Sequence, residues 1–313
     1  MNSILLTEKQ QIRHQIAFCC DDNYAPYLGV TLASMIENCP DLYNYSICVF
    51  GSCLSEESKA NLNSLIDNTG LIITFLDIDD GMLPPSTPTT GHITITTYFR
   101  ILLADLLPEE VEKVLYLDCD LLVVNDLKGF FDVDLGDDLI AGVENPGFER
   151  ANVLGMDESW GYFNAGVIMC HLKQWRAEGF KDTVFGVIER LCDHLEFWDQ
   201  DALNVAVEGR WKQISPVFNM QNSFYLRTPK SLGLSGSELA RLRKEAVITH
   251  FSSAFKPWQW AGAHPMQKEY FRYLDMTDLK GYRPRASGLR DRYRAVRASL
   301  RGLKSSMLCR IFP

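Results

Sequence analysis

Two aspartates, Asp118 and Asp120, interrupt the apolar stretch VEKVLYLDCDLLVV (111–124), the most strand-like segment of the chain. Side chains two residues apart on a strand point to the same face, so this spacing predicts two neighbouring carboxylates. In apolar surroundings such a pair is unfavourable unless a cation lies between them. Oxygen ligands favour a hard divalent cation, and an imidazole from His250 would shift the preference from magnesium towards manganese. Alternatively, the two aspartates simply end a strand and begin a turn.

A second polar group follows the first apolar run, QIAFCC (15–20), where the sequence predicts a strand. Asp21, Asn23 and Tyr24 come directly after this run. In α/β folds nucleotides bind beside the carboxyl ends of strands, so this position favours a nucleotide pocket. Asp21 and Asn23 are equally suited to cap the helix that follows, which leaves both interpretations open.

Four later features have both a chemical and an ordinary structural interpretation: Asn164, the triplet Asp199-Gln200-Asp201, His250 and Lys256. Asn164 is either a site residue or a turn residue, and one member of the triplet is expected to cap a helix. A lone histidine is more often a structural residue than a metal ligand, and a lone lysine usually lies on the surface. No GxGxxG and no GxxxxGKS/T motif occurs, so dinucleotide-binding and P-loop proteins are disfavoured.

The elements expected to position these residues alternate between strand and helix. Short apolar runs predict strands at 15–20, 45–51, 71–78, 111–124, 139–143 and 163–170. Apolar periods of three to four predict helices at 27–38, after the cap Ser55, and around 97–106, 171–193 and 199–207. This alternation implies parallel βαβ units, hence an α/β fold with a mostly parallel central sheet. A loop rich in Pro, Ser, Thr and Gly (84–91) is a candidate lid.

The composition is that of a soluble globular protein, with 313 residues, 46% of them hydrophobic and 23% charged. The formal charge of −9 argues against a nucleic-acid-binding protein, which usually has a basic face. The nine cysteines form no CxxC pair and several lie in apolar runs, so a reducing compartment is expected. Neither a signal-peptide pattern nor an apolar run of membrane-spanning length occurs, which predicts a cytoplasmic protein. Residues 1–280 are expected to form one domain.

Residues 281–313 are expected to form a basic tail, because the stretch 283–313 carries nine Lys or Arg and one Asp, a balance of 9 − 1 = +8. Its apolar side chains are spaced four and three residues apart: Leu289, Tyr293, Val296, Leu300, Leu303 and Met307. This stripe predicts an amphipathic helix that lies on an anionic membrane surface, which would make the protein peripheral on the inner face of the cytoplasmic membrane. Alternatively, the helix packs on the domain or on a partner subunit.

Six blocks, taken in order, resemble glycosyltransferase family 8, which includes bacterial lipopolysaccharide galactosyl- and glucosyltransferases and the glycogenins. The blocks are AFCCDDNYAPYLGV, HITITTYFRILLADLL, KVLYLDCDLLVV, YFNAGVIM, WDQDALN and HFSSAFKPW. The ITTY-x-R and DQD blocks look most similar to those of the lipooligosaccharide α-galactosyltransferases. The resemblance implies a GT-A fold, a UDP-sugar donor, a saccharide acceptor, and a retaining transfer that uses manganese, with magnesium as the alternative.

The resemblance also assigns roles to residues. It implies three metal ligands, Asp118, Asp120 and His250. It implies that the donor is bound by Cys20, Asp21, Asn23, Tyr24, Arg100, Asp118, Cys119, Glu144, Asn164, Gln200, Ser253 and Lys256. Tyr24 would stack on the base and Lys256 would contact the diphosphate. The catalytic residues would be Gln200, Asp199 and Asp201, and the lid would include His92 and Thr97.

Two positions depart from the family pattern. Glu144 stands where the galactosyltransferases usually carry Asp, which leaves the donor sugar open among galactose, glucose and their N-acetyl forms. Ser253 stands where the family usually has glycine, three residues after the metal histidine. Glycine lets the backbone approach a diphosphate closely, so serine implies a different loop or a hydroxyl contact.

The resemblance predicts a retaining hexosyltransferase that acts on a lipopolysaccharide or another lipid-linked or cell-surface glycan. Retention can proceed through a covalent intermediate, for which Asp201 is a candidate nucleophile, or by same-face attack. Same-face attack is favoured because an amide, Gln200, stands where a nucleophile would be expected. Two other functions stay open: a glycogenin-like self-glucosylating protein, and a non-catalytic protein that binds sugar nucleotides.

Overall fold

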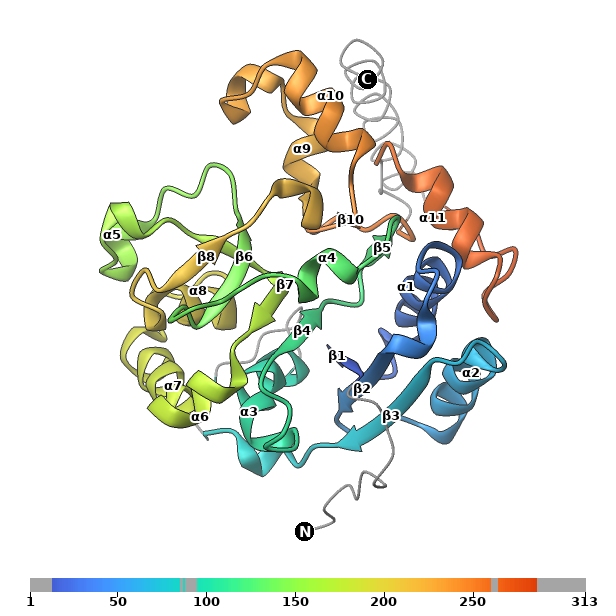
Figure 1. Cartoon of the computed structure of the whole chain (residues 1–313), viewed down its shortest axis with the longest axis horizontal. Coiled ribbons are helices and arrows are strands. Elements are labelled where there is room, and N and C mark those ends of the chain that lie inside the picture. Colours follow the sequence, from blue (N-terminus) through green and yellow to red (C-terminus); the bar gives the residue numbers. More distant parts are fainter. Residues whose placement is uncertain (1–12, 85–86, 88–94, 260–263, 286–313) are drawn as a thin grey trace. The chain divides into compact units, whose positions relative to one another are not determined.

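The computed structural model describes residues 13–84, 87, 95–259 and 264–285 (Figure 1). The chain divides into two compact units. The large unit comprises Met1–Asn23, Asp41–Asp118 and Lys128–Ile214. The small unit comprises Tyr24–Pro40, Cys119–Leu127 and Ser215–Pro313. The chain passes from one unit to the other immediately after Asp118, so the two aspartates of the DCD motif belong to different units.

A seven-stranded sheet forms the centre of the large unit, in the order β3-β2-β1-β4-β7-β6-β8. Its strands are β1 (His14–Cys19), β2 (Tyr45–Gly51), β3 (Ile72–Asp77), β4 (Val114–Leu117), β6 (Ile140–Glu144), β7 (Phe163–Cys170) and β8 (Trp211–Gln213). Strands β3, β2, β1 and β4 run parallel, and so do β6 and β8, whereas β7 is antiparallel to both of its neighbours. The predicted α/β fold with a mostly parallel sheet is therefore confirmed.

The helices of the large unit are α2 (Glu56–Ile66), α3 (Leu103–Leu106), α4 (Lys128–Phe131), α5 (Ala151–Leu154), α6 (Leu172–Glu178), α7 (Phe180–Leu191) and α8 (Trp198–Ala206). Ser55 caps α2 as predicted, because its hydroxyl accepts a hydrogen bond from the backbone N–H of Ser58. The helix predicted at 97–106 is instead a 3₁₀ helix, Ile95–Leu102, followed by the single turn of α3. Gly179, with φ of 62°, separates α6 from α7.

The small unit contains a three-stranded sheet in the order β5-β10-β9. Its elements are α1 (Ala25–Asn38), β5 (Leu121–Val123), β9 (Met220–Gln221), α9 (Asn222–Leu226), α10 (Gly236–Lys244), β10 (Ile248–His250) and α11 (Gln267–Leu274). Helices α1 and α11 lie side by side (Figure 1), and Asn38 donates a 2.7 Å hydrogen bond to the hydroxyl of Tyr273. Asn38 also donates to the carbonyl of Val123 at 3.1 Å, which ties α1 to β5.

The prediction of one long strand at 111–124 is wrong. The segment forms β4 in the large unit and β5 in the small unit, with Asp118 to Asp120 in the break between them. An apolar run shows that a segment is buried but does not show which sheet each part joins. The two carboxylates therefore do not share one face of a strand.

Some predictions concern residues outside the described ranges. His92, most of the candidate lid at 84–91 and almost all of the basic tail at 281–313 are among them. Within the described ranges, no helix is long and apolar enough to cross a membrane.

Candidate active site

Asp118 directly follows β4 in the large unit, and its carboxylate is held by two side chains. The hydroxyl of Tyr116 donates to Asp118 Oδ1 at 2.8 Å, and Arg100 Nη2 lies 3.1 Å from the same oxygen. The backbone N–H of Asp118 donates to the carbonyl of Gly166 on β7 at 2.8 Å. These contacts fix the carboxylate at the carboxyl end of β4, where α/β folds bind nucleotides.

Arg100 lies on the 3₁₀ helix Ile95–Leu102 and is buried, with its guanidinium in contact with two carboxylates. Its Nε lies 2.9 Å from Asp199 Oδ2, and its Nη1 donates to the carbonyl of Ala165 at 2.8 Å. Nε donates to the carbonyl of Thr97 at 3.0 Å, so Asp199 Oδ2 has the charge of Arg100 nearby but no aligned hydrogen bond. Thr97, predicted as a lid residue, thus supports Arg100 through its carbonyl oxygen.

Asp199 is buried at the start of α8, and its carboxyl has an unusual pKa. Burial raises that pKa from its ordinary value of 3.8 to about 7, although the neighbouring Arg100 charge opposes the shift. The site in the large unit therefore holds two carboxylates, Asp118 and Asp199, against one guanidinium.

Gln200 lies on the same helix, and both the oxygen and the nitrogen of its side-chain amide make hydrogen bonds. Its Oε1 accepts from Asn164 Nδ2 at 3.1 Å and from the backbone N–H of Ala165 at 2.9 Å. Its Nε2 donates to the hydroxyl of Tyr162 at 3.1 Å. Asn164 and Gly166 both lie within β7, so the alternative interpretation of Asn164 as a turn residue is wrong.

Asp201 is completely buried, and both of its oxygens accept hydrogen bonds. The hydroxyl of Tyr162 donates to Oδ1 at 2.6 Å. The backbone N–H groups of Glu196 and Phe197 donate to Oδ2 at 2.8 and 2.9 Å, and Arg150 Nη1 donates to the same oxygen at 3.3 Å. Asp201 lies in the first turn of α8 and binds the two backbone N–H groups just before this helix. The N-cap residue of α8 is Phe197, which makes no side-chain cap, so the expectation that one member of the triplet caps a helix is wrong.

The N-terminal block is divided between the units. Cys20 is buried directly after β1, and Asp21 and Asn23 follow it in the large unit. Helix α1 begins after Tyr24 with no side-chain cap, so the alternative that Asp21 or Asn23 caps this helix is wrong. Tyr24 is 36% exposed in the small unit, where its ring meets the edge of Trp258 at 6.2 Å.

In the small unit, Asp120 faces His250 at the end of β10. His250 Nε2 lies 3.2 Å from Asp120 Oδ1, and both side chains are buried. His250 Nδ1 lies 3.0 Å from Oδ1 of Asn219, which is also completely buried. The amide oxygen can only accept, so the ring proton of a neutral His250 lies on Nδ1 and Nε2 presents its lone pair to Asp120.

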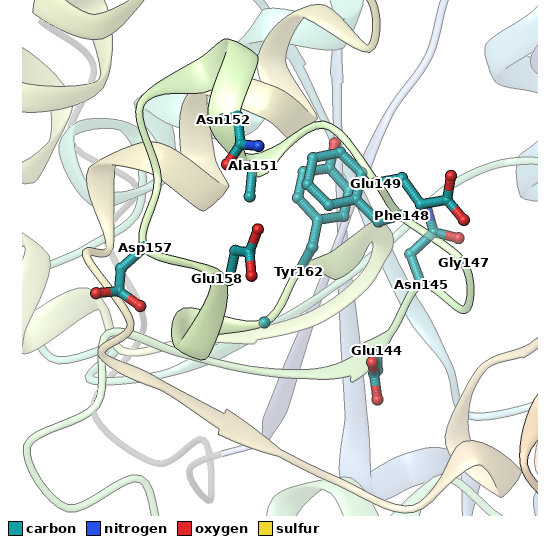
Figure 2. A pocket seen from close by; sticks show the side chains of 11 residues that line it. Glu144, Asn145, Gly147, Phe148, Glu149, Ala151, Asn152, Asp157, Glu158 and Tyr162 are labelled. Atoms are coloured by element: carbon teal, nitrogen blue, oxygen red, sulfur yellow. The ribbon is translucent and has the colours of Figure 1, made fainter.

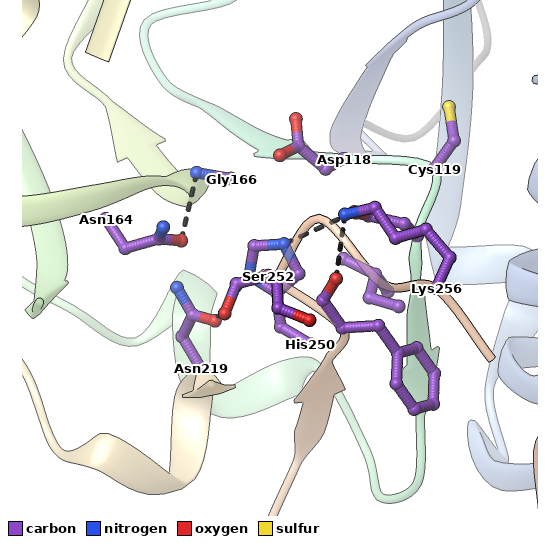
Figure 3. Close-up of polar contacts among 12 residues, drawn as sticks. Asp118, Cys119, Asn164, Gly166, Asn219, His250, Ser252 and Lys256 are labelled. Atoms are coloured by element: carbon purple, nitrogen blue, oxygen red, sulfur yellow. Dashed lines mark hydrogen bonds and ion pairs between the residues drawn. The ribbon is translucent and has the colours of Figure 1, made fainter. Parts of the chain in front are cut away.

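Lys256, which lies near His250 in Figure 3, supplies a positive charge to Asp120. Its Nζ contacts Asp120 Oδ2 and donates to the carbonyl of Phe251 at 2.8 Å. Burial would raise the pKa of the Asp120 carboxyl, but the charge of Lys256 holds it well below its usual range.

The loop between His250 and Lys256 is held by side-chain hydroxyls. Ser253 accepts a hydrogen bond from Asn222 Nδ2 at 2.9 Å and donates to the carbonyl of Phe255 at 3.1 Å. The hydroxyl of the serine that replaces the family's glycine is thus bound within the loop.

The Asp120–His250 pair fits a divalent cation. Asp120 Oδ1 is buried without a hydrogen-bond partner, and it faces an imidazole nitrogen that carries a lone pair. Two acceptors 3.2 Å apart repel each other unless a cation binds both. Asp118 precedes Asp120 by two residues, so the chain itself brings a third candidate ligand towards this pair. Cys119 between them is buried, and its carbonyl accepts from the hydroxyl of Thr31 at 3.1 Å.

A pocket of about 370 Å³ opens in the connection between β6 and β7 (Figure 2). Glu144, at the end of β6, lines it and accepts a 3.1 Å hydrogen bond from Gln213. The opposite part of the lining includes the stacked rings of Phe148 and Tyr162, whose centroids are 3.5 Å apart. Because the hydroxyl of Tyr162 also contacts Gln200, this pocket adjoins the carboxylate cluster of the large unit.

The predicted residues thus form one cluster in each unit. The large unit brings together Arg100, Asp118, Asn164, Asp199 and Gln200, and the small unit brings together Asp120, His250 and Lys256. Glu144 lies apart from both, exposed at the pocket. Sequence reasoning missed Tyr116, Tyr162 and Asn219, which orient Asp118, Gln200 and His250. Nothing in their local sequence distinguishes them from ordinary buried residues.

Comparison with known proteins gives a consistent result. Residues 15–261 match the family model described as Glycosyl transferase family 8. General stress protein A of Bacillus subtilis is 31% identical over 275 residues, which cover 86% of this chain and 95% of that protein. Lipopolysaccharide 1,3-galactosyltransferase of Salmonella typhimurium is 27% identical over 267 residues, 83% of this chain and 77% of that protein. The crystal structure of the galactosyltransferase LgtC with donor and acceptor sugar analogs superimposes with a TM-score of 0.73 at 26% identity, covering 90% of this chain and 99% of LgtC.

Proposed function

Because this chain belongs to glycosyl transferase family 8 and has the GT-A fold, we propose that it is a metal-dependent retaining hexosyltransferase that uses a UDP-sugar donor. The observation that carries the proposal is the Asp120–His250 pair, a buried carboxylate oxygen without a hydrogen-bond partner facing an imidazole lone pair. Its position two residues after Asp118 is that of the metal-binding motif implied by the family resemblance.

In this proposal the small unit holds the metal and the diphosphate. Asp120 and His250 bind the ion, with Asp118 as the third ligand. When bound, the ion supplies Lewis-acid stabilisation of the charge that develops on the leaving diphosphate. The ammonium of Lys256 contacts the same diphosphate and adds a second positive charge. Tyr24, which is partly exposed beside Trp258, offers a ring on which the base can stack.

In the large unit, Arg100 and Asp199 hold the donor sugar together with Asn164 and Gln200. Arg100 is rigid because its guanidinium contacts two carbonyl oxygens and lies 4.3 Å from the ring centre of Tyr116. The side-chain amide of Gln200 is held in the cluster because its Oε1 accepts hydrogen bonds from Asn164 and from the backbone of Ala165. Such preorganised dipoles stabilise a sugar that develops positive charge in the transition state.

The environment of Asp201 favours same-face attack over a covalent intermediate. A nucleophilic carboxylate needs an oxygen that can reach the anomeric carbon. Both oxygens of Asp201 are buried and accept hydrogen bonds from Tyr162, Arg150 and backbone N–H groups. In the proposed mechanism the leaving phosphate accepts the proton of the acceptor hydroxyl, and Asp201 holds the start of α8 in place.

The donor sugar is galactose or glucose in this proposal, since the relatives include a lipopolysaccharide galactosyltransferase and lipopolysaccharide glucosyltransferases. The acceptor is a lipopolysaccharide or another cell-surface glycan, which approaches from the pocket beside Glu144. Attachment to the inner membrane surface through residues 281–313 remains a sequence-based proposal, supported by the basic amphipathic pattern alone.

The test is a donor screen with purified full-length protein. UDP-glucose, UDP-galactose and their N-acetyl forms are each incubated with the protein, Mn²⁺ and simple glycoside acceptors. The mass of each product identifies the transferred sugar, and the anomeric configuration of the product is then determined. The expected result is transfer from one hexose donor, with retention, that stops on addition of EDTA. Sugar attached to the protein itself would favour the glycogenin-like alternative. Absence of both transfer and donor hydrolysis with every donor would contradict an enzymatic role.

A further inference from the structure

We infer that two side chains that are not metal ligands, Asn219 and Lys256, set the affinity of the free protein for a divalent cation in opposite directions. Asn219 increases it by holding His250 in the binding-competent tautomer. Lys256 decreases it by occupying Asp120 until the donor diphosphate attracts the ammonium away. This inference rests on the metal role proposed for Asp120 and His250, and every residue in it belongs to the small unit.

Asn219 acts through the imidazole. Its amide oxygen lies 3.0 Å from His250 Nδ1 and is completely buried, so water does not compete for this hydrogen bond. The contact keeps the proton on Nδ1 and leaves the Nε2 lone pair for a cation. Without it, the proton can move to Nε2 and form a hydrogen bond with Asp120 Oδ1, which is 3.2 Å away and otherwise has no partner. Such a hydrogen bond would occupy both ligand atoms at once.

Lys256 acts through charge. Its ammonium contacts Asp120 Oδ2 and the carbonyl of Phe251, and its side chain is only 15% exposed. A divalent cation that binds Asp120 meets an ammonium already in contact with the same carboxylate, so the two charges repel unless the lysine moves. Lysine has a flexible four-carbon stem, which allows that movement without a change in the backbone.

The displaced ammonium then has a new partner. A diphosphate offers several anionic oxygens, and Lys256 reaches from the loop that follows His250. Cation binding releases Lys256 for the diphosphate, and diphosphate binding draws Lys256 away from the cation. Because such coupling is reciprocal, UDP should tighten Mn²⁺ binding by the same factor as Mn²⁺ tightens UDP binding.

The experiment measures Mn²⁺ binding to the donor-free protein, by the electron paramagnetic resonance signal of free Mn²⁺. Asn219→Leu is expected to weaken binding about 10- to 100-fold. Asn219→Asp, which keeps an acceptor oxygen for Nδ1, is expected to restore most of the affinity. Lys256→Met is expected to tighten binding on the order of tenfold, because it removes the competing charge. Lys244→Met, at an exposed lysine in the same unit, is the matched control and should change nothing.

Asn219→Leu and Lys256→Met are expected to change Mn²⁺ affinity in opposite directions. General damage to the small unit would instead weaken Mn²⁺ binding in both variants, so the assay distinguishes this inference from a merely structural role. Unchanged or weaker binding in Lys256→Met would overturn the part played by Lys256. Equal affinities in Asn219→Leu and the wild type, at equal melting temperatures, would overturn the part played by Asn219. Wild-type protein that transfers sugar with EDTA present and binds no Mn²⁺ would refute the metal role and leave a glycosyltransferase.

Discussion

Asp118 and Asp120 are two residues apart in the chain, yet they have counter-ions of different kinds. Asp118 ends a strand of the large unit and pairs with Arg100, whose guanidinium is buried and held by two carbonyl oxygens. Asp120 begins the small-unit segment and pairs with Lys256, an ammonium at the end of a flexible stem. The first counter-ion is held by further contacts, whereas the second is the one that we infer to be displaced by a divalent cation.

The same contrast is visible in the acidities of the buried carboxyls. Asp120 is buried, yet the charge of Lys256 holds its pKa well below the usual range. Asp199 is equally buried, but it shares Arg100 with Asp118, and burial raises its pKa to about 7. This difference is consistent with Arg100 being shared by two carboxylates, whereas Lys256 contacts Asp120 alone.

The largest effect on activity is expected when the Asp120–His250 pair is removed. Replacing Asp120 by alanine leaves His250 without a carboxylate partner, and we expect it to abolish both Mn²⁺ binding and sugar transfer. Asp118→Ala should also abolish transfer, because it removes the proposed third ligand. Initial rates with Mn²⁺ check both variants. Near-normal turnover in either variant, together with insensitivity to EDTA, would remove the metal from the mechanism.

The difference between the two aspartates could not be read from the sequence. The apolar runs predicted the large sheet well, and the bounds of β2 and β7 agree residue for residue with the predicted 45–51 and 163–170. The run at 111–124 failed because burial alone does not show that the chain leaves one sheet and joins another. The family resemblance identified the residues of the motif but not their separate environments.

Tyr162 and Asn219, which support the site residues, could not be predicted for a related reason. Tyr162 and Asp201 are 39 residues apart, and Asn219 and His250 are 31 apart. Their hydrogen bonds depend on tertiary packing, and no local spacing or periodicity marks them. Capping of α1 by Asp21 or Asn23 was predicted as an alternative from residue type, and it failed because the N-cap residue is Tyr24, which makes no side-chain cap.

The second prediction tests the ion pairs of Arg100. Arg100→Met leaves Asp118 and Asp199 without their shared cation, and we expect it to lower the free energy of unfolding by about 3–5 kcal/mol, as for other broken buried ion pairs. Adding Asp199→Asn should restore part of that loss, because it removes one uncompensated carboxylate. Urea denaturation measures both. The control is Arg272→Met, which breaks exposed pairs with Glu37 and Glu269 and should cost about 1 kcal/mol or less.

The smallest effect is expected in the pH dependence of stability, and it follows from Asp199. Its pKa is about 7 in the folded protein and near 3.8 when unfolded, so between these values the folded state holds a proton that the unfolded state has lost. Stability contributed by this group is therefore present in acid and is lost as the pH rises through 7, by at most about 1.4 kcal/mol per pH unit.

Asp199→Asn removes this titration, so the stability of the variant should fall less steeply than that of the wild type between pH 5 and 6. The contributions of the other groups that titrate in this range cancel when the slope of unfolding free energy against pH in the variant is subtracted from that in the wild type. A steeper slope in the variant, or two equal slopes, would mean that Arg100 keeps Asp199 ionised. In that case the guanidinium would compensate both of its carboxylates as fully as Lys256 compensates Asp120, and the contrast between the two units would disappear.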